Sequence, residues 1–313
     1  MKSYSVIIRT LTGGDKYGVL LDSLRNQTAK PAQGIVIQPF NYPPPEQKLG
    51  CERFVQCKKG MWEQRIFGME YCHALPNHSK YLLVCDDDLS FEPDFAEKLI
   101  EIAETHKADT LVPIADYRCS RLKNFIGKIF GERTENRTSP YKITIKANGR
   151  YTVNNSLKDN VNPTQSGPFQ CFLMRTDIVP ELCLREECWL DDTRYAWPDD
   201  QVFFYKAHLK GLRTLSCKTP TFKHLDGRSG VPSRERQIDS IYSHGRNIVI
   251  FWNRFILPNR KNKLAVLQAR TSFAYYILMA RMRYLILSAK RRDLNVLRTF
   301  NKGVSDGRGY LKA

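Results

Sequence analysis

The sequence predicts an α/β fold, in which a mixed, mainly parallel central sheet is followed by a C-terminal helical extension. Two observations carry this prediction. Short apolar runs that fit buried strands alternate with segments of helical spacing between residues 5 and 217. Beyond Arg234 the chain becomes helical, aromatic and basic. We therefore expect one α/β domain over residues 1–233 and a basic, amphipathic helical region over residues 234–313.

The individual elements follow from the same two patterns. A short run of apolar, strand-forming residues between polar neighbours predicts a buried strand, and apolar residues at three- and four-residue intervals predict a helix. Because the chain begins strand–helix–strand, we expect a parallel sheet with its ligand at the carboxyl ends of the strands. The expected strands are 5–10, 34–38, 81–85, 109–114, 169–174 and 214–217, and the expected helices are 17–26, 60–73, 93–105 and 201–210.

Residues 118–166 interrupt this alternation. They are polar, basic and rich in Gly and Asn, and they offer one edge strand at 141–145. A long excursion of this kind inside a compact domain is usually functional or mobile. We interpret it as a lid or a substrate-side loop, and a variable insertion is the alternative.

The net charge of +17 is concentrated near the C-terminus. Between Arg246 and Lys312 there are fifteen Lys and Arg residues but only two Asp. A nearly neutral body with a basic C-terminal segment fits docking onto an anionic surface better than dedicated nucleic-acid binding.

Residues 264–287 are mostly apolar, yet Arg270, Arg281 and Arg283 interrupt them. Each charge would cost a membrane-spanning helix about 2.5 to 3.5 kcal/mol near its centre. We therefore expect an amphipathic helix that lies in the membrane interface. The alternative is that these helices pack on the α/β domain and present a basic face to solvent.

The number and spacing of the cysteines indicate the cellular compartment in which the protein works. The nine cysteines are an odd number without a CxxC pair, and the chain runs from Met1 directly into a strand, with no signal peptide. We expect a reducing cytoplasm. The basic C-terminal region adds the option of peripheral attachment to the inner face of the plasma membrane.

Three consecutive carboxylates, Asp86, Asp87 and Asp88, follow the apolar run 81–85. Adjacent carboxylates repel one another, so they are stable together only around a cation or in solvent. Their oxygens are ligands that suit Mg²⁺ or Mn²⁺. The pattern predicts a metal site at the end of a buried strand, and the alternative is a solvated acidic turn before the next helix.

Several stretches, taken in order, resemble the family 2 glycosyltransferases of GT-A fold. The resemblance extends over nearly the whole chain. It implies a GT-A type single Rossmann-like domain and an inverting enzyme of the bacterial surface-polysaccharide type. The matching stretches are the first strand 5–10, the helix end 21–28, the acidic triplet 86–88, the segment 197–201 with Lys206 and Gly211, the set Tyr242, Arg246 and Asn247, and the ending 300–307.

The resemblance also implies roles for single residues. The triplet 86–88 matches the DxD-type motif, which holds a divalent metal on the sugar-nucleotide diphosphate. Asp200 takes the place of the catalytic base and Asp199 that of the usual Glu, and His224 stands where members carry a histidine near the diphosphate. The implied nucleotide-sugar-binding residues are Thr10, Gln38, Arg65, Asp86 and Asp87, and the implied metal ligands are Asp86, Asp88 and His224. Independently of the resemblance, we expect the acceptor contacts to be Asp191, Asp192 and Trp197.

One position departs from the family pattern. Gln38 and Pro39 stand after the second strand, where the family usually has an Asp that contacts the nucleotide. The sequence therefore does not predict which nucleotide is bound.

The chemistry of the residues agrees with the resemblance. Mn²⁺ or Mg²⁺ held by Asp86 and Asp88 would neutralise a departing diphosphate. Asp200 would deprotonate the acceptor hydroxyl as general base; Asp199 can exchange roles with it, and one of the two can serve as a helix N-cap. The expected partners are a nucleotide-diphosphate sugar donor, a glycan or polyprenyl-linked acceptor and an anionic membrane surface, with no nucleic acid.

Three other function classes remain open at this stage. A metal-dependent phosphoester hydrolase or a nucleotidyltransferase could also use clustered aspartates. A non-catalytic, nucleic-acid-binding protein would use the basic segment, and its binding would weaken steeply with salt.

Overall fold

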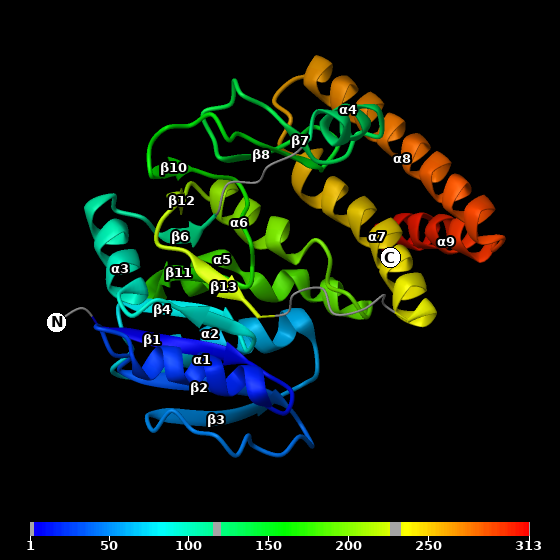
Figure 1. Ribbon diagram of the computed structural model, residues 1–313. Helices are drawn as coiled ribbons and strands as arrows, with labels where there is room; N and C mark the ends of the chain where they lie inside the picture. The colour runs from blue at the N-terminus through cyan, green and yellow to red at the C-terminus, as the bar shows by residue number, and fades with distance from the viewer. Residues whose placement is uncertain (1–2, 115–119, 226–232, 313) are drawn as a thin grey trace.

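An eight-stranded sheet runs through the computed structural model, which describes residues 3–114, 120–225 and 233–312 (Figure 1). The strand order is β10-β12-β6-β11-β4-β1-β2-β3. β1 to β4 run parallel, β6 and β12 run parallel to each other, and β11 is antiparallel to β4 and β6. These strands are β1 (Tyr4–Arg9), β2 (Gln33–Pro39), β3 (Glu52–Cys57), β4 (Tyr81–Asp86), β6 (Thr110–Pro113), β10 (Val161–Pro163), β11 (Cys171–Arg175) and β12 (Thr214–Cys217).

Helices cover both faces of this sheet. Along β1, Val6 and Ile8 point to one face and Ile7 to the other, because successive side chains of a strand alternate. The first face packs against α1 (Asp15–Arg25) and α3 (Phe95–Thr105). The second packs against α2 (Met61–Ala74) and α6 (Asp199–Leu209), and α7 (Arg234–Phe251), α8 (Lys263–Arg291) and α9 (Asn295–Tyr310) continue the same hydrophobic cluster beyond them. The predicted mixed, mainly parallel α/β fold with C-terminal helices is confirmed.

The segment 118–166 is more ordered than its composition predicts. Residues 118 and 119 lie outside the described residues, and the remainder forms a helix and four short strands. The expected edge strand is present, but it is one of three in a small separate sheet, while β10 joins the edge of the main sheet. These elements are α4 (Arg121–Ile129), β7 (Thr134–Glu135), β8 (Ile143–Ile145) and β9 (Tyr151–Val153).

Smaller elements complete the fold. β5 (Leu89–Phe91) pairs with β13 (Phe222–His224) in a two-stranded antiparallel sheet directly after the acidic triplet. Neither strand was predicted, because each is only three residues long. The connection from β11 to α6 contains the 3₁₀ helices Thr176–Ile178 and Leu184–Asp192 and α5 (Val179–Leu182), and a π-helical turn, Trp252–Ile256, follows α7.

The C-terminal helices belong to the same hydrophobic core as the sheet. Ile248 and Phe251 of α7 and Phe300 of α9 are fully buried in the cluster that also contains Phe203 of α6. The C-terminal helices therefore pack on the α/β domain. Within the described ranges, no helix combines the length and the apolarity needed to cross a bilayer.

Glycines allow α7 and α9 to cross in close contact. A Cβ atom at Gly303 would lie 2.5 Å from the carbonyl oxygen of Tyr242, and one at Gly307 would lie 2.5 Å from that of Arg246. Between these glycines, Asp306 accepts a 2.8 Å hydrogen bond from the Tyr242 hydroxyl. The set Tyr242, Arg246 and Asn247 and the ending 300–307, which both resemble family motifs, thus meet in one helix–helix contact.

Replacing Gly303 by alanine is therefore expected to destabilise the protein by about 1 to 3 kcal/mol, the usual cost of overpacking. The added methyl group must push α9 away from α7. Urea unfolding followed by circular dichroism would measure the effect. Gly309→Ala is the matched control, because it lies in the same helix with nothing within 4 Å of its added Cβ. Equal effects of the two substitutions would contradict the close-contact explanation.

Candidate active site

Asp86, the last residue of β4, is held by two arginines. Arg9, at the end of the neighbouring β1, donates to Asp86 Oδ1 at 3.1 Å, and Arg65 of α2 donates to the same oxygen at 2.8 Å. Burial alone would raise the pKa of Asp86, but the charges of Arg65 and Arg9 outweigh it and hold the pKa below its usual value. Asp86 is therefore an ionised carboxylate whose hydrogen-bonding capacity is largely used by the protein.

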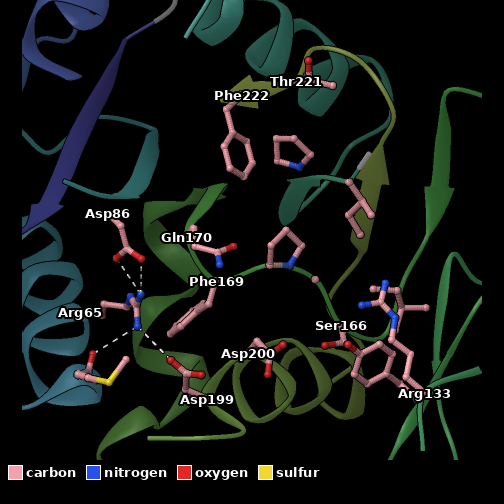
Figure 2. A pocket seen from close by; sticks show the side chains of 17 residues that line it. Arg65, Asp86, Arg133, Ser166, Phe169, Gln170, Asp199, Asp200, Thr221 and Phe222 are labelled. Carbon is pink, nitrogen blue, oxygen red and sulfur yellow. Dashed lines mark hydrogen bonds and ion pairs between the residues drawn. The ribbon is translucent and has the colours of Figure 1, made fainter. Parts of the chain in front are cut away.

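Arg65 connects Asp86 to the second acidic pair. Its Nη1 donates to Asp199 Oδ2 at 3.0 Å, while its Nη2 contacts Asp86, and its side chain is only 4% exposed (Figure 2). The guanidinium also lies 4.5 Å from the ring centre of Phe169. One buried cation thus fixes the distance between the acids at the end of β4 and those at the start of α6.

The side chain of Asp87 contacts the loop after β1 and not the two arginines. It accepts a 2.5 Å hydrogen bond from the hydroxyl of Thr10, which in turn accepts one from the backbone N–H of Gly13 at 3.0 Å. Asp87 and Asp88 line a small hollow of about 270 Å³ together with Gly13 and the first residues of α1. Of the expected nucleotide-binding residues, Thr10 and Asp87 are in direct contact here.

Gln38 lies behind this hollow. It is fully buried, and its amide nitrogen donates to the carbonyl oxygens of Leu11 and Pro43. Its amide oxygen is buried and has no hydrogen-bond partner in the structure. Gln38 therefore holds the loop after β1 in place.

Asp88 and His224 come together through the pairing of β5 with β13. The backbone N–H of Leu225 donates to the carbonyl oxygen of Asp88 at 2.8 Å, and His224 Nε2 lies 3.1 Å from Asp88 Oδ2. The other oxygen, Oδ1, is buried without a hydrogen-bond partner. An unpartnered carboxylate oxygen beside an imidazole nitrogen fits a divalent cation.

These two residues do not make a complete metal centre. Within residues 3–114, 120–225 and 233–312, no group of three or more His, Cys, Asp or Glu side chains is arranged to hold a metal ion. Asp86, the third expected ligand, faces the arginines instead. A cation at Asp88 and His224 would need further oxygen ligands from outside the protein.

A larger cavity of about 640 Å³ opens on the other side of Arg65. Asp199 and Asp200 lie at one end of this cavity, at the first turn of α6, and Phe222 lies across it (Figure 2). Sequence reasoning missed most of its lining, because these residues come from segments that only the fold brings together. The missed residues include Arg133, Ile143, Tyr151, Ser166, Phe169, Gln170 and Phe222.

The two adjacent carboxylates of α6 have different surroundings. Asp199 is paired with Arg65, whereas Asp200 Oδ1 accepts only the backbone N–H of Gln201, at 2.7 Å. Burial, and then the neighbouring charge of Asp199, raises the pKa of Asp200 to about 7. Burial also raises the pKa of Asp199, against the opposing charge of Arg65. Asp200 is thus the member of the pair that can exchange a proton near neutral pH.

The structure does not bring Asp191, Asp192 and Trp197 into this cavity. Asp191 accepts the backbone N–H groups of Trp62 at 3.0 Å and Glu63 at 2.6 Å, so it caps the N-terminus of α2. Asp192 forms a 2.5 Å ion pair with Arg246, and the Trp197 ring packs edge-on against His244. Asp191 and Asp192 line a separate hollow of about 350 Å³.

Comparison with known proteins supports the fold. No protein-family model matches the chain, and no curated protein sequence matches it. The crystal structure of GalNAc-T7 with UDP, GalNAc and Mn²⁺ is similar with a TM-score of 0.54 at 13% identity, covering 81% of this chain and 48% of that one. S. aureus TarS residues 1–349 in complex with UDP-GlcNAc gives a TM-score of 0.47 at 13% identity, covering 98% and 92%.

A longer S. aureus TarS structure gives a TM-score of 0.47 at 14% identity, and this chain covers 54% of its length. The chain therefore spans about half the length of that TarS structure and of GalNAc-T7. At these identities the likeness is one of fold alone, and it agrees with the predicted mixed, mainly parallel α/β fold.

Replacing Asp200 by asparagine is expected to stabilise the protein at pH 8 but not at pH 4. The pKa of Asp200 is higher in the folded state than in the unfolded chain, so stability is lost as the pH rises from about 4 to about 7. Because the side chain of Asp200 is partly open to the cavity, we expect Asp200→Asn to raise the free energy of unfolding by about 1 to 2 kcal/mol at pH 8.

Urea unfolding at the two pH values would measure this gain. Asp159→Asn, at an exposed position in a loop, is the control. If Asp200→Asn changed the free energy of unfolding equally at pH 4 and pH 8, burial would not oppose ionisation of this carboxyl group.

Proposed function

We propose that this chain is an inverting glycosyltransferase that moves a sugar from a nucleotide-diphosphate sugar to a hydroxyl group of a glycan or lipid-linked acceptor. The observation that carries the proposal is the arrangement around Arg65. On one side lie the acids that end β4, and on the other lies Asp200, whose pKa is raised to about 7. A leaving-group site and a proton acceptor on opposite sides of one cavity are what such a transfer needs.

The donor would occupy the ends of β1 and β4. Thr10 and Asp87 would contact the nucleotide in the hollow beside Gly13, and Gln38 would set the shape of that corner. Asp86 and Arg65 would lie between the nucleotide and the sugar. A nucleotide-sugar donor is supported by the fold similarity to GalNAc-T7, which was solved with UDP, GalNAc and Mn²⁺.

Asp88 and His224 would hold a divalent cation, Mn²⁺ or Mg²⁺, together with oxygens of the donor diphosphate. The buried, unpartnered Asp88 Oδ1 supports this, and Mg²⁺ in particular is usually bound by one or two carboxylates plus substrate phosphates. When bound, the cation supplies positive charge that stabilises the departing nucleoside diphosphate.

Asp200 would act as the general base. The acceptor oxygen attacks the anomeric carbon, its proton passes to Asp200, and the bond from that carbon to the diphosphate oxygen breaks. A single displacement of this kind inverts the anomeric centre. Asp199, held by Arg65, supplies the negative charge that keeps the pKa of Asp200 near neutrality.

The experiment that tests this proposal is a donor panel. UDP-, GDP- and dTDP-sugars are supplied with Mn²⁺ or Mg²⁺, and release of nucleoside diphosphate is followed. We expect metal-dependent turnover of at least one donor. Asp200→Asn should lower the rate by about 10² to 10⁴-fold, as expected for loss of a general base. Asp88→Ala should lower the rate and raise the metal concentration that is needed for half-maximal turnover.

Asp159→Asn, far from these residues in the sequence and exposed, is the control and should keep full activity. Release of inorganic phosphate from phosphoesters without any sugar nucleotide would instead favour a hydrolase. Turnover that is unchanged in both D88A and D200N would contradict the proposed site.

A further inference from the structure

α8 has two apolar faces. One face packs on the protein through buried side chains that include Phe273, Tyr276 and Tyr284. A helix on the surface of a soluble domain normally has polar residues on its opposite face. Here the opposite face is also apolar and exposed, with residues at three- and four-residue intervals. They are Leu264, Leu267, Tyr275, Leu278, Met282, Leu285 and Ile286.

α4 extends this exposed apolar surface. Leu122, Phe125, Ile126 and Ile129 of α4 are between 38% and 67% exposed. The Tyr275 hydroxyl of α8 donates a 2.7 Å hydrogen bond to the carbonyl oxygen of Ile129, so the end of α4 lies against the middle of α8 (Figure 1). Eleven of the eighteen large apolar side chains that are exposed in the described part of the chain lie on these two helices.

All charged side chains on α8 itself are basic, and one of them, Arg283, forms a 2.9 Å ion pair with Glu132, which follows α4. α8 contains six Lys and Arg residues and no Asp or Glu. The helical repeat of 3.6 residues places basic residues along both edges of its exposed apolar face. One edge carries Lys263, Arg270 and Arg281, and the other carries Arg283 and Lys290. An apolar centre between two basic edges is the pattern of a helix that lies in the interface of an anionic membrane.

We propose that α4 and the outer face of α8 form a docking surface for an anionic lipid bilayer, with the axis of α8 parallel to the membrane plane. Charge complementarity selects this occupant. In a symmetric dimer the same surface would face itself, and the basic edges would repel one another. A nucleic acid would use the basic edges but would leave the apolar centre without a partner.

This surface is close to the larger cavity along the chain. The segment that follows α4 supplies Arg133 and Ile143 to the cavity lining. Docking would therefore place the cavity near the bilayer, which suits a lipid-linked acceptor. That consequence rests on the proposed function, whereas the docking surface itself does not.

The test is co-sedimentation of the full chain with phosphatidylcholine vesicles, with and without phosphatidylglycerol. No sugar donor is added, so the result does not depend on the transfer reaction. We expect binding to the anionic vesicles and much weaker binding to the neutral ones. Leu278→Glu with Met282→Glu should lower the affinity at least ten-fold, because it places two charges at the centre of the apolar face.

The matched control is Val19→Glu with Phe40→Glu. Val19 and Phe40 are 45% and 57% exposed, compared with 46% for Met282 and 54% for Leu278, but they lie in α1 and just after β2. The control should bind like the wild type. Circular dichroism would check that both double variants are folded.

Three results would overturn the proposal. The first is that the wild-type chain does not sediment with anionic vesicles. The second is that L278E/M282E binds as well as the wild type, which would leave only a nonspecific charge effect. The third is that sedimentation velocity without lipid finds a dimer that L278E/M282E converts to a monomer, which would assign the surface to a second copy of the chain.

Discussion

The candidate site depends on the guanidinium of Arg65. It is nearly fully buried, and it bridges Asp86 at the end of β4 to Asp199 at the start of α6. A buried charge without partners is costly, so the three groups constrain one another's positions. Burial raises the pKa of both adjacent carboxyl groups. Arg65 donates a hydrogen bond to Asp199 and opposes the rise there, whereas the pKa of Asp200 is raised to about 7.

The position of Arg65 is in turn set by distant parts of the chain. α2 carries Arg65, and Asp191 caps the N-terminus of that helix. The segment that contains Asp191 is held by α7, where Arg246 donates to the Trp189 carbonyl oxygen and Asn247 donates to that of Trp197. The C-terminal helices therefore hold the segment that positions Arg65. Their outer side carries the exposed apolar face of α8 with its basic edges.

The sequence predicted the parts of this arrangement that follow from local patterns. The apolar runs located the main strands. The acids at the end of β4 were noticed from their position, and those at the start of α6 from the resemblance of the segment 197–201 to a family motif. It could not predict that Asp191 caps α2, because that contact joins residues far apart in the chain. α4 was missed because the segment 118–166 was interpreted as a polar loop, although Leu122, Phe125, Ile126 and Ile129 have the spacing of one helix face. Likewise, only the fold brings Arg9 and Arg65 to Asp86, where a metal was expected.

The central claim is that Asp200 takes up a proton near neutral pH because its carboxyl group is buried and because Asp199 is charged beside it. Carbon-13 NMR of aspartate-labelled protein tests this directly, with D200N used to assign the Asp200 carboxyl signal. We predict that the signal titrates with a pKa near 7 and that Asp199→Asn lowers this value, since removing the neighbouring charge eases ionisation. A wild-type pKa near the ordinary value of about 4, or a value that Asp199→Asn leaves unchanged, would contradict the account.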